Sequence, residues 1–313
     1  MKLRSYAKIN LSLDVLGIRE DGYHEVATVM QQISLSDDID IEWQEGPAKE
    51  NTAPAEGSKL NIRLTTNRKY LPTDGRNLAY KAALLMEKKA GEMGKTFCGD
   101  LTIDIFKRIP VAAGLAGGSG NGAAVLIGLN RIWELGLDTK ELCEIGSELG
   151  SDVPFMVLVQ NSRYTCALGT GKGEALTPIP KDLDMCFLLA KPKFGVSTKE
   201  VYKGLDESGE YDHPDRDALI KALEDGDTSG AIENMGNVLE TYTLKAYPEV
   251  NELKKKISET SGVRFVMMSG SGPTVIGFYD DLGDAKKAAA HFKELGYESF
   301  YAGNMRRNRG RNQ

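Results

Sequence analysis

Metal-binding and disulfide-forming side chains are scarce in this chain. Its 313 residues include four cysteines and three histidines, and they are scattered along the sequence with no Cys-x-x-Cys pair. We therefore expect reduced thiols, with neither a disulfide framework nor a metal site built by the protein. Uninterrupted apolar runs of about 20 residues are also missing, which argues against a transmembrane helix and a membrane partner. The first eight residues lack the apolar segment of a signal peptide, so we expect a cytoplasmic protein.

An excess of positive charge is missing as well. The chain has 45 acidic and 39 basic side chains, and the resulting net charge of −6 argues against nucleic-acid binding. The segment 306–313 is basic but short and terminal, and we expect a disordered tail. A hydrophobic fraction of 41% and a charged fraction of 27% are typical of a globular protein with one large or two ordinary domains.

Glycine, by contrast, is abundant and is concentrated between Pro110 and Ala124. Glycine lacks a Cβ atom, so its backbone can take positive φ and bring N–H groups close to a ligand. The apolar run 123–133, which has helical spacing, follows at once. The start of a helix offers unpaired N–H donors and the positive end of a dipole. Together these features predict a phosphate site and hence a nucleotide or phosphorylated metabolite as ligand, although a tight turn is the alternative.

Two common nucleotide motifs do not describe this stretch. No G-x-x-x-x-G-K-[ST] sequence occurs in the chain, so it has no Walker A loop. Residues 118–123 do match G-x-G-x-x-A, the dinucleotide fingerprint. That fingerprint requires a helix leading into a strand that ends in an acidic residue, whereas we expect a second helix to follow, so hydride transfer is not favoured.

Periodicity predicts an α+β chain. We expect strands over 3–16, 26–33, 39–43, 101–105, 156–159, 185–190, 263–268, 275–279 and 299–302. We expect helices over 77–90, 123–135, 139–149, 219–223, 232–239 and 285–295. Segregated helices with mostly antiparallel strands favour α+β over a doubly wound sheet. The segment 45–58 is polar without periodicity, and we interpret it as a surface excursion.

Two charged residues are candidates for catalysis. Asp152 lies in Gly-Ser-Asp-Val-Pro-Phe, where a proline turn and a buried strand would hold it in place. A carboxylate held in this way can accept a proton from a substrate hydroxyl, although it can also merely cap a turn. Lys8 lies in an alternating strand, where a solvated lysine is the ordinary case. If Lys8 points inward it needs a carboxylate or phosphate partner, for which Asp152 is a candidate.

Two turns have a second interpretation. The segment 21–25 contains Tyr23 and His24, and it is either a hairpin turn with exposed side chains or a shelf for a flat ring. The segment 269–274, Ser-Gly-Ser-Gly-Pro-Thr, is either a hairpin turn or a second small-residue loop that lets substrate or the first loop pack closely.

Taken together, several segments resemble the GHMP small-molecule kinases. They follow that family's order and span nearly the whole chain: 7–11, 21–25, 76–82, 107–119, 150–155, 195–202 and 269–274. The resemblance implies the family's two-domain α+β fold with the active site in the cleft between the domains. The implied domains are a nucleotide-binding domain over 1–160 and a ferredoxin-like substrate domain over 161–305, followed by the tail over 306–313.

The same resemblance implies an enzyme that uses ATP and Mg²⁺. Within the family, the chain is most similar to kinases that phosphorylate the 2-hydroxyl of the methylerythritol moiety of a cytidine-diphospho sugar alcohol, a small-molecule substrate in isoprenoid synthesis. Another GHMP kinase, acting on mevalonate, homoserine or a sugar, is an alternative, and so is a nucleotide-binding homologue without turnover. A monomer or weak homodimer is expected.

Site residues follow from the resemblance, residue by residue. Asp152 matches the catalytic base and Lys8 the lysine beside it. The backbone that cradles the ATP phosphates is matched by Pro110, Gly114, Leu115, Ala116, Gly117, Gly118, Ser119 and Gly120. Asn77 and Lys107 are expected near the adenosine. Asn10 is expected near the transferred group, and Tyr23, His24 and Tyr202 around the cytosine.

The chain departs from the family pattern in two places. Gly120 stands where the family usually has a hydroxyl residue, and Gly122 replaces an alanine, which weakens the first helical turn by up to ~1 kcal/mol. The segment 159–167 is longer than usual and lacks paired glycines. The first departure affects side-chain contacts to phosphate, and the second affects the exact substrate.

Overall fold

The computed structural model describes residues 1–46, 58–209 and 211–305. Most of the expected surface excursion and all of the expected basic tail lie outside these residues. The chain divides into two compact units, each assembled from separate segments. The first unit contains Met1–Tyr6, Ser36–Ile109 and Ala116–Arg163, and the second contains Ala7–Leu35, Pro110–Leu115 and Tyr164–Gln313. The expected boundary between the two domains, after residue 160, stays a prediction.

Two long strands run through both units. Strand β1 covers Lys2–Ile18 and strand β2 covers His24–Glu45. We expected two strands in place of β2, separated by the polar residues 34–38. The structure shows one continuous strand, because Asp37 in the middle of this polar stretch is buried and fully engaged by hydrogen bonds.

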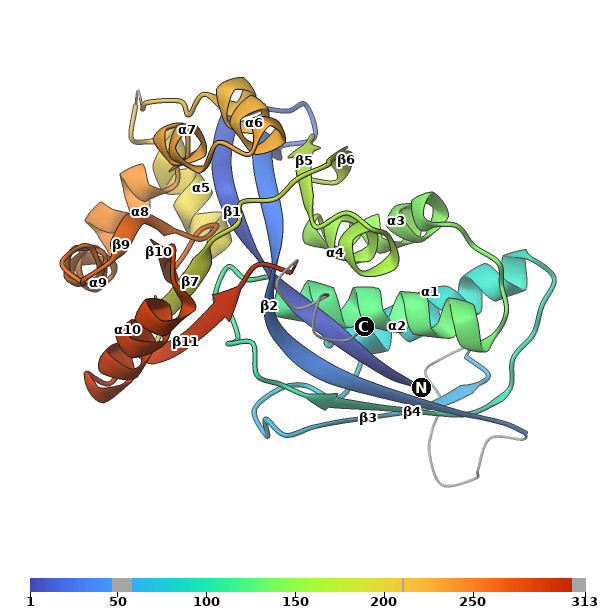
Figure 1. Cartoon of the computed structure of the whole chain (residues 1–313). Coiled ribbons are helices and arrows are strands. Elements are labelled where there is room, and N and C mark those ends of the chain that lie inside the picture. Colours follow the sequence, from blue (N-terminus) through green and yellow to red (C-terminus); the bar gives the residue numbers. More distant parts are fainter. Residues whose placement is uncertain (47–57, 210, 306–313) are drawn as a thin grey trace. The chain divides into compact units, whose positions relative to one another are not determined.

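The sheet of the first unit contains β3 (Leu60–Thr66), β4 (Gly99–Phe106) and the second part of β2. Strand β4 lies in the middle, parallel to β3 and antiparallel to β2. Alternate residues of β4, Leu101, Ile103 and Ile105, are buried, as in a strand with one covered face. Helices α1 (Leu78–Glu92) and α2 (Gly117–Ile132) contact each other, and α1 also contacts β3 (Figure 1).

Two further helices complete the first unit. Helix α3 (Thr139–Ser147) has the expected position, and α4 (Asp152–Asn161) packs against both α2 and α3. The expected strand over 156–159 is therefore wrong. A short apolar run does not distinguish a strand from a buried helix, and Pro154 is tolerated in the first turn of a helix. The expected start of α2 at residue 123 is also too late, since the helix already begins at Gly117.

The second unit contains a four-stranded antiparallel sheet in the order β11-β7-β10-β9. Its strands are β7 (Cys186–Lys191), β9 (Val263–Met268), β10 (Val275–Tyr279) and β11 (Glu298–Gly303). All four were expected at nearly these residues. Helices α9 (Pro248–Ser258) and α10 (Leu282–Glu294) supply Leu253 and Phe292 to the core beneath the sheet.

The remaining elements of the second unit surround the first part of β2 and β1. Strand β5 (Cys166–Thr170) pairs with β2 and with β6 (Ala175–Ile179), while β8 (Gly236–Asn237) pairs in parallel with β1. The unit also has helices α5 (Thr198–Asp206), α6 (Arg216–Asp225), α7 (Thr228–Glu233) and α8 (Glu240–Ala246). The expected helix over 232–239 is wrong, because α7 ends at Glu233 and the next residues join the sheet.

Candidate active site

The glycine-rich stretch opens as a loop of alternating backbone handedness. Ala112, Gly114 and Ala116 have positive φ values of 52°, 70° and 53°, whereas the residues between them do not. Such alternation turns successive N–H groups toward one side and forms a concavity that suits an anion. For the two alanines this conformation costs about 1–2 kcal/mol each, and a cost of this kind is typical of ligand sites.

The first turn of α2 continues this row of donors. Its first internal hydrogen bond runs from Gly120 N to Ala116 O at 2.8 Å, so the N–H groups of residues 117–119 have no partner within the helix. Ala116 precedes the helix and provides no side-chain cap. Three free amides and the positive end of the helix dipole make this turn a suitable anion site, as the sequence predicted.

Close packing explains why glycine occupies two positions of this turn. A Cβ at Gly117 would lie 2.8 Å from Ile109 Cγ2, and one at Gly120 would lie 2.6 Å from Ser5 Oγ and 3.1 Å from Tyr6 O. Helix α2 therefore meets Ile109 and the start of β1 with no room for a side chain at residues 117 and 120. The Ser5 hydroxyl is buried and, among the described residues, has no hydrogen-bond partner. Ser5 thus occupies the space into which a residue-120 side chain would extend.

Asp152 is the first residue of α4, where the helix dipole favours a negative charge. Residues four apart lie on one face of a helix, so Asp152, Met156 and Gln160 share a face. Gln160 Nε2 donates to Gly120 O at 3.3 Å, and Met156 Cε lies 3.2 Å from the Cβ position of Gly120. The α4 face that bears Asp152 therefore packs on the first turn of α2.

Lys107 belongs to a buried network that joins three elements of the first unit. Its ammonium donates to Asp37 Oδ2 and, at 3.0 Å, to Asn121 Oδ1 on α2. Asn121 Nδ2 donates to Asp37 Oδ2 at 3.0 Å, and Asp37 Oδ1 accepts from the backbone N–H groups of Arg108 and Ile109. Burial lowers the pKa of Lys107, and the Asp37 carboxylate opposes this shift. The network ties α2 to β2 and to the end of β4.

Asn77 caps the neighbouring helix α1. Its Oδ1 accepts from Ala79 N at 3.0 Å, and its Nδ2 donates to Pro72 O at 2.8 Å. Leu78 lies 3.5 Å from the Cβ position of Gly122 on α2. The start of α1 thus lies beside the first turns of α2, whereas the adenosine contacts of Asn77 and Lys107 stay predictions.

In the second unit, Lys8 points inward and is only 4% exposed. Its Nζ donates to Asn10 Oδ1 at 2.9 Å, and Asn10 Nδ2 donates to Thr28 Oγ1 at 2.8 Å. Its backbone N–H donates to Leu115 O at 3.2 Å, which attaches β1 to the glycine loop directly after Gly114. Pro110 in this loop is buried and Gly114 is half-buried. Lys8 and Asp152 belong to different units, and their pairing stays a prediction.

The segment 269–274 packs closely on the glycine loop. Ser269 Oγ donates to Gly114 O at 3.0 Å, and a Cβ at Gly114 would lie 2.3 Å from Ser269 O. The Cβ position of Gly270 lies 3.6 Å from the Gly114 backbone and 3.7 Å from Asn10 Oδ1. This arrangement confirms that the segment is a small-residue loop that allows the first loop to pack closely.

The residues expected around a cytosine also gather in the second unit. The rings of His24 and Tyr202 lie 4.7 Å apart at an interplanar angle of 37°. Tyr23 is 61% exposed, and Lys172 Nζ lies 4.7 Å from its ring centroid. The structure thus provides a surface of aromatic rings at this hairpin, which favours the shelf over a plain turn.

Several residues that contact the predicted site residues were not among the residues expected from the sequence. They are Ser5, Asp37, Asn121, Lys172 and Asp206. Asp206 accepts a hydrogen bond from His24 Nε2 at 2.9 Å. Its spacing of four from Tyr202 on a helix was the available signal. Asp37 offered no signal, because its partner Lys107 lies 70 residues away.

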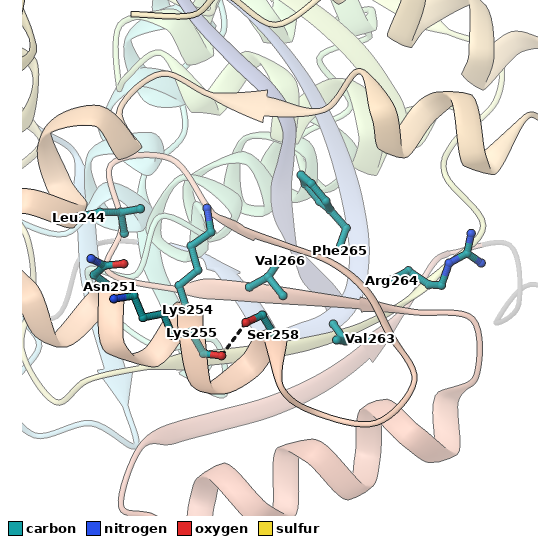
Figure 2. A pocket seen from close by; sticks show the side chains of 9 residues that line it. All are labelled: Leu244, Asn251, Lys254, Lys255, Ser258, Val263, Arg264, Phe265 and Val266. Atoms are coloured by element: carbon teal, nitrogen blue, oxygen red, sulfur yellow. Dashed lines mark hydrogen bonds between the residues drawn. The ribbon is translucent and has the colours of Figure 1, made fainter.

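A pocket of about 430 Å³ lies elsewhere in the second unit, between α9 and the edge strand β9 (Figure 2). None of the predicted site residues lines it. One of its cationic side chains, Lys254, is already paired with Glu240 at 2.6 Å. The pocket is therefore separate from the residues that the sequence nominated.

Family models match both halves of the chain. Residues 77–159 match the GHMP kinases N terminal domain, and residues 219–298 match the GHMP kinases C terminal domain. The chain belongs to the GHMP kinase family. It is accordingly an ATP-dependent small-molecule kinase with that family's two-domain α+β fold, as expected. No described helix has the length and apolar character required to cross a membrane.

Individual GHMP kinases match over nearly the whole chain. A 4-diphosphocytidyl-2-C-methyl-D-erythritol kinase of Alkaliphilus oremlandii is 46% identical over 96% of this chain and 94% of its own length. The corresponding protein of Alkaliphilus metalliredigens is 44% identical over 92% of this chain and 91% of its own. A crystal structure of 4-(cytidine 5'-diphospho)-2C-methyl-D-erythritol kinase is 30% identical, has a TM-score of 0.75, and covers 97% of this chain and all of that one.

Proposed function

We propose that this GHMP kinase transfers the γ-phosphoryl group of ATP to the 2-hydroxyl of 4-diphosphocytidyl-2-C-methyl-D-erythritol, in the non-mevalonate route to isoprenoid precursors. The names of relatives that match over at least nine-tenths of both chains support this substrate. The structural observation that carries the proposal is the first turn of α2. There, three amides have no partner within the helix, and the Asp152-bearing face of α4 packs against the same turn.

Asp152 is the proposed general base. As it accepts the proton of the acceptor hydroxyl, the hydroxyl oxygen forms a bond to the γ-phosphorus, and the bond to the β–γ bridging oxygen breaks to release ADP. Phosphoryl transfer requires little covalent work from the protein, so positioning and charge stabilisation supply most of the rate. The amides of residues 117–119 would hold the phosphates during this step.

Lys8 is the proposed electrostatic partner. A lysine near a carboxylate favours its ionised form, and the same ammonium stabilises charge that develops on the transferred group. The hydrogen bond to Asn10 and the onward bond to Thr28 fix the direction of the Lys8 side chain. Asn10 would then touch the substrate close to the reacting hydroxyl.

The proposed metal is Mg²⁺ carried by ATP. Among residues 1–46, 58–209 and 211–305, no cluster of three or more His, Cys, Asp or Glu side chains could hold a metal ion. This composition fits Mg²⁺, which is commonly bound through substrate phosphates, waters and one or two protein groups. Ser119 offers a hydroxyl beside the free amides. When bound, Mg²⁺ neutralises charge on the phosphates.

The cytosine would lie at Tyr23, His24 and Tyr202. The exposed Tyr23 ring and the adjoining His24–Tyr202 pair favour a substrate with a flat base over mevalonate, homoserine or a simple sugar. We also place the activity in the cytoplasm and propose a monomer or weak homodimer. Size-exclusion chromatography with light scattering would measure the oligomeric state.

The test is ADP release measured with each candidate acceptor. We expect rapid, ATP-dependent turnover with 4-diphosphocytidyl-2-C-methyl-D-erythritol and little with mevalonate, homoserine or galactose. Mass spectrometry should show the product heavier by one phosphoryl group. Turnover confined to another acceptor would replace the proposed substrate, whereas binding of both ligands without ADP release would identify a homologue that has lost turnover.

A further inference from the structure

A carboxylate on α5 fixes the imidazole at the start of β2. Asp206 Oδ1 lies 2.9 Å from His24 Nε2, and the His24 side chain is only 15% exposed. Tyr202, one helical turn before Asp206, contacts the same imidazole with its ring. Helix α5 thus presents a ring and a carboxylate together, and both contact His24.

This hydrogen bond determines which nitrogen of His24 carries the proton. An ionised carboxylate only accepts hydrogen bonds, so Nε2 must be the donor. In a neutral imidazole the other nitrogen, Nδ1, is then unprotonated and is an acceptor. Among the described residues no group donates to Nδ1, so this acceptor is not used by the part of the chain that the structure describes.

A hydrogen-bond acceptor at His24 Nδ1 would favour one of the two common pyrimidines over the other. Cytosine carries an amino group at C4, which donates, whereas uracil carries an oxo group there, which accepts. We propose that Asp206 is a positioning residue that sets the nucleobase preference of the enzyme, because it holds the His24 proton on Nε2 and so presents an acceptor to the base. The inference rests on the proposed function, which puts the pyrimidine at His24.

The preference for cytosine over uracil should depend on the carboxylate of Asp206, which only accepts hydrogen bonds, and not merely on the size of the side chain at 206. An asparagine at 206 can either donate or accept, so it permits both tautomers of His24. In the second tautomer Nδ1 is a donor and suits the oxo group of uracil. Asp206→Asn should therefore weaken cytidine binding and strengthen uridine binding, whereas a purely structural role would change both in the same direction.

Titration calorimetry with CDP and UDP tests the inference. We expect the unmodified enzyme to bind CDP at least about tenfold more tightly than UDP, since a mismatched polar group loses a hydrogen bond and leaves its partner unpaired. Asp206→Asn and Asp206→Ala should each reduce this ratio at least fivefold and leave the KM for ATP unchanged. Glu207→Gln is the matched control, because it removes a carboxylate from the adjacent, exposed position, and it should keep the ratio.

The outcomes separate the two hypotheses. If the unmodified enzyme prefers CDP and both Asp206 variants keep that preference, Asp206 does not set the tautomer and the inference is wrong. If the unmodified enzyme binds CDP and UDP equally, the proposed pyrimidine site at His24 is itself wrong.

Discussion

Lys107 and Asp37 form an ion pair that is almost completely removed from solvent, with side-chain exposures of 4% and 0%. Asp37 also accepts hydrogen bonds from two backbone amides and from Asn121, so one carboxylate joins β2, the end of β4 and helix α2. A buried lysine that loses its counter-charge is costly, whatever the net contribution of the intact pair.

We therefore predict that Asp37→Asn destabilises the protein by about 3–5 kcal/mol. Urea unfolding followed by circular dichroism would measure the change. The adjacent Asp38→Asn is the control, because Asp38 makes an exposed ion pair with Arg108 that is worth about 0–1 kcal/mol. Equal effects of the two substitutions would contradict a structural role for the buried pair.

Asp152→Asn should lower kcat by roughly 10²–10⁴-fold, because a general base contributes about that much. ATP binding should be largely retained, since the amides at the start of α2 are unchanged. Steady-state kinetics and nucleotide titration would separate the two effects, with the exposed Glu148→Gln in the same unit as control. A variant that keeps more than a tenth of its activity would show that Asp152 is not the base.

Gly114→Ala should distort the proposed phosphate-binding loop for two reasons, an unfavourable backbone conformation and a steric clash. The residue has a φ of 70°, and the new Cβ would lie 2.3 Å from the Ser269 carbonyl oxygen. We expect the Kd for ATP to rise at least about tenfold, equivalent to about 1.4 kcal/mol. Gly136→Ala provides the comparison, because Gly136 has a φ of 74° and open space around it, so it isolates the backbone cost. Nucleotide titration that finds the two variants equally impaired would remove the contact with Ser269 from the explanation.

Gly120→Ala should cost about 1–3 kcal/mol, the usual range for an overpacked core. Its Cβ would lie 2.6 Å from Ser5 Oγ, so part of this cost should disappear in the Ser5→Ala background. Thermal unfolding of the four proteins in the double-mutant cycle would give the coupling energy. Gly118→Ala should be tolerated, because its Cβ would meet only Leu78 Cδ1 at 3.8 Å. Strict additivity of the Ser5 and Gly120 effects would refute the steric account.

Tyr23→Ala should raise the KM for the cytidine substrate and leave the KM for ATP unchanged, because an exposed ring at the hairpin offers a stacking face for the base. Tyr301→Ala removes a comparably exposed ring from β11 and should change neither constant. Initial-rate measurements that vary one substrate at a time would give the two KM values separately. A parallel rise in both constants would place Tyr23 outside the cytosine site.

Elements with clear periodicity were predictable from sequence. The alternating residues of β4 and the four strands of the second sheet were located to within about two residues. The apolar run 153–159 was not, because a buried helix and a buried strand have the same composition over so short a length. The long β2 was divided into two strands because Asp37 interrupts its apolar pattern. Lys107, Asn121 and two backbone amides, all distant in sequence, satisfy the buried carboxylate.

The site was predictable where motifs are local and unpredictable where contacts are distant. The amides near Gly117 follow from a glycine run that leads into a helix. The family resemblance supplied Asp152 and Lys8, and the structure adds that Lys8 is buried. Asp206 and Ser5 come from segments with no recognisable motif, so only the folded chain reveals their contacts with His24 and with Gly120 on α2.

The tight contact between Ser5 and Gly120 also constrains how this lineage can vary. A hydroxyl residue at 120 would place its Cβ 2.6 Å from Ser5 Oγ, so the Ser5 side chain has to shift or shrink to admit it. Loss of the Ser5 hydroxyl relieves this contact, so a change at position 5 lowers the free-energy cost of a later change at position 120. The two sites, 115 residues apart in the gene product, are therefore expected to change as an ordered pair during evolution.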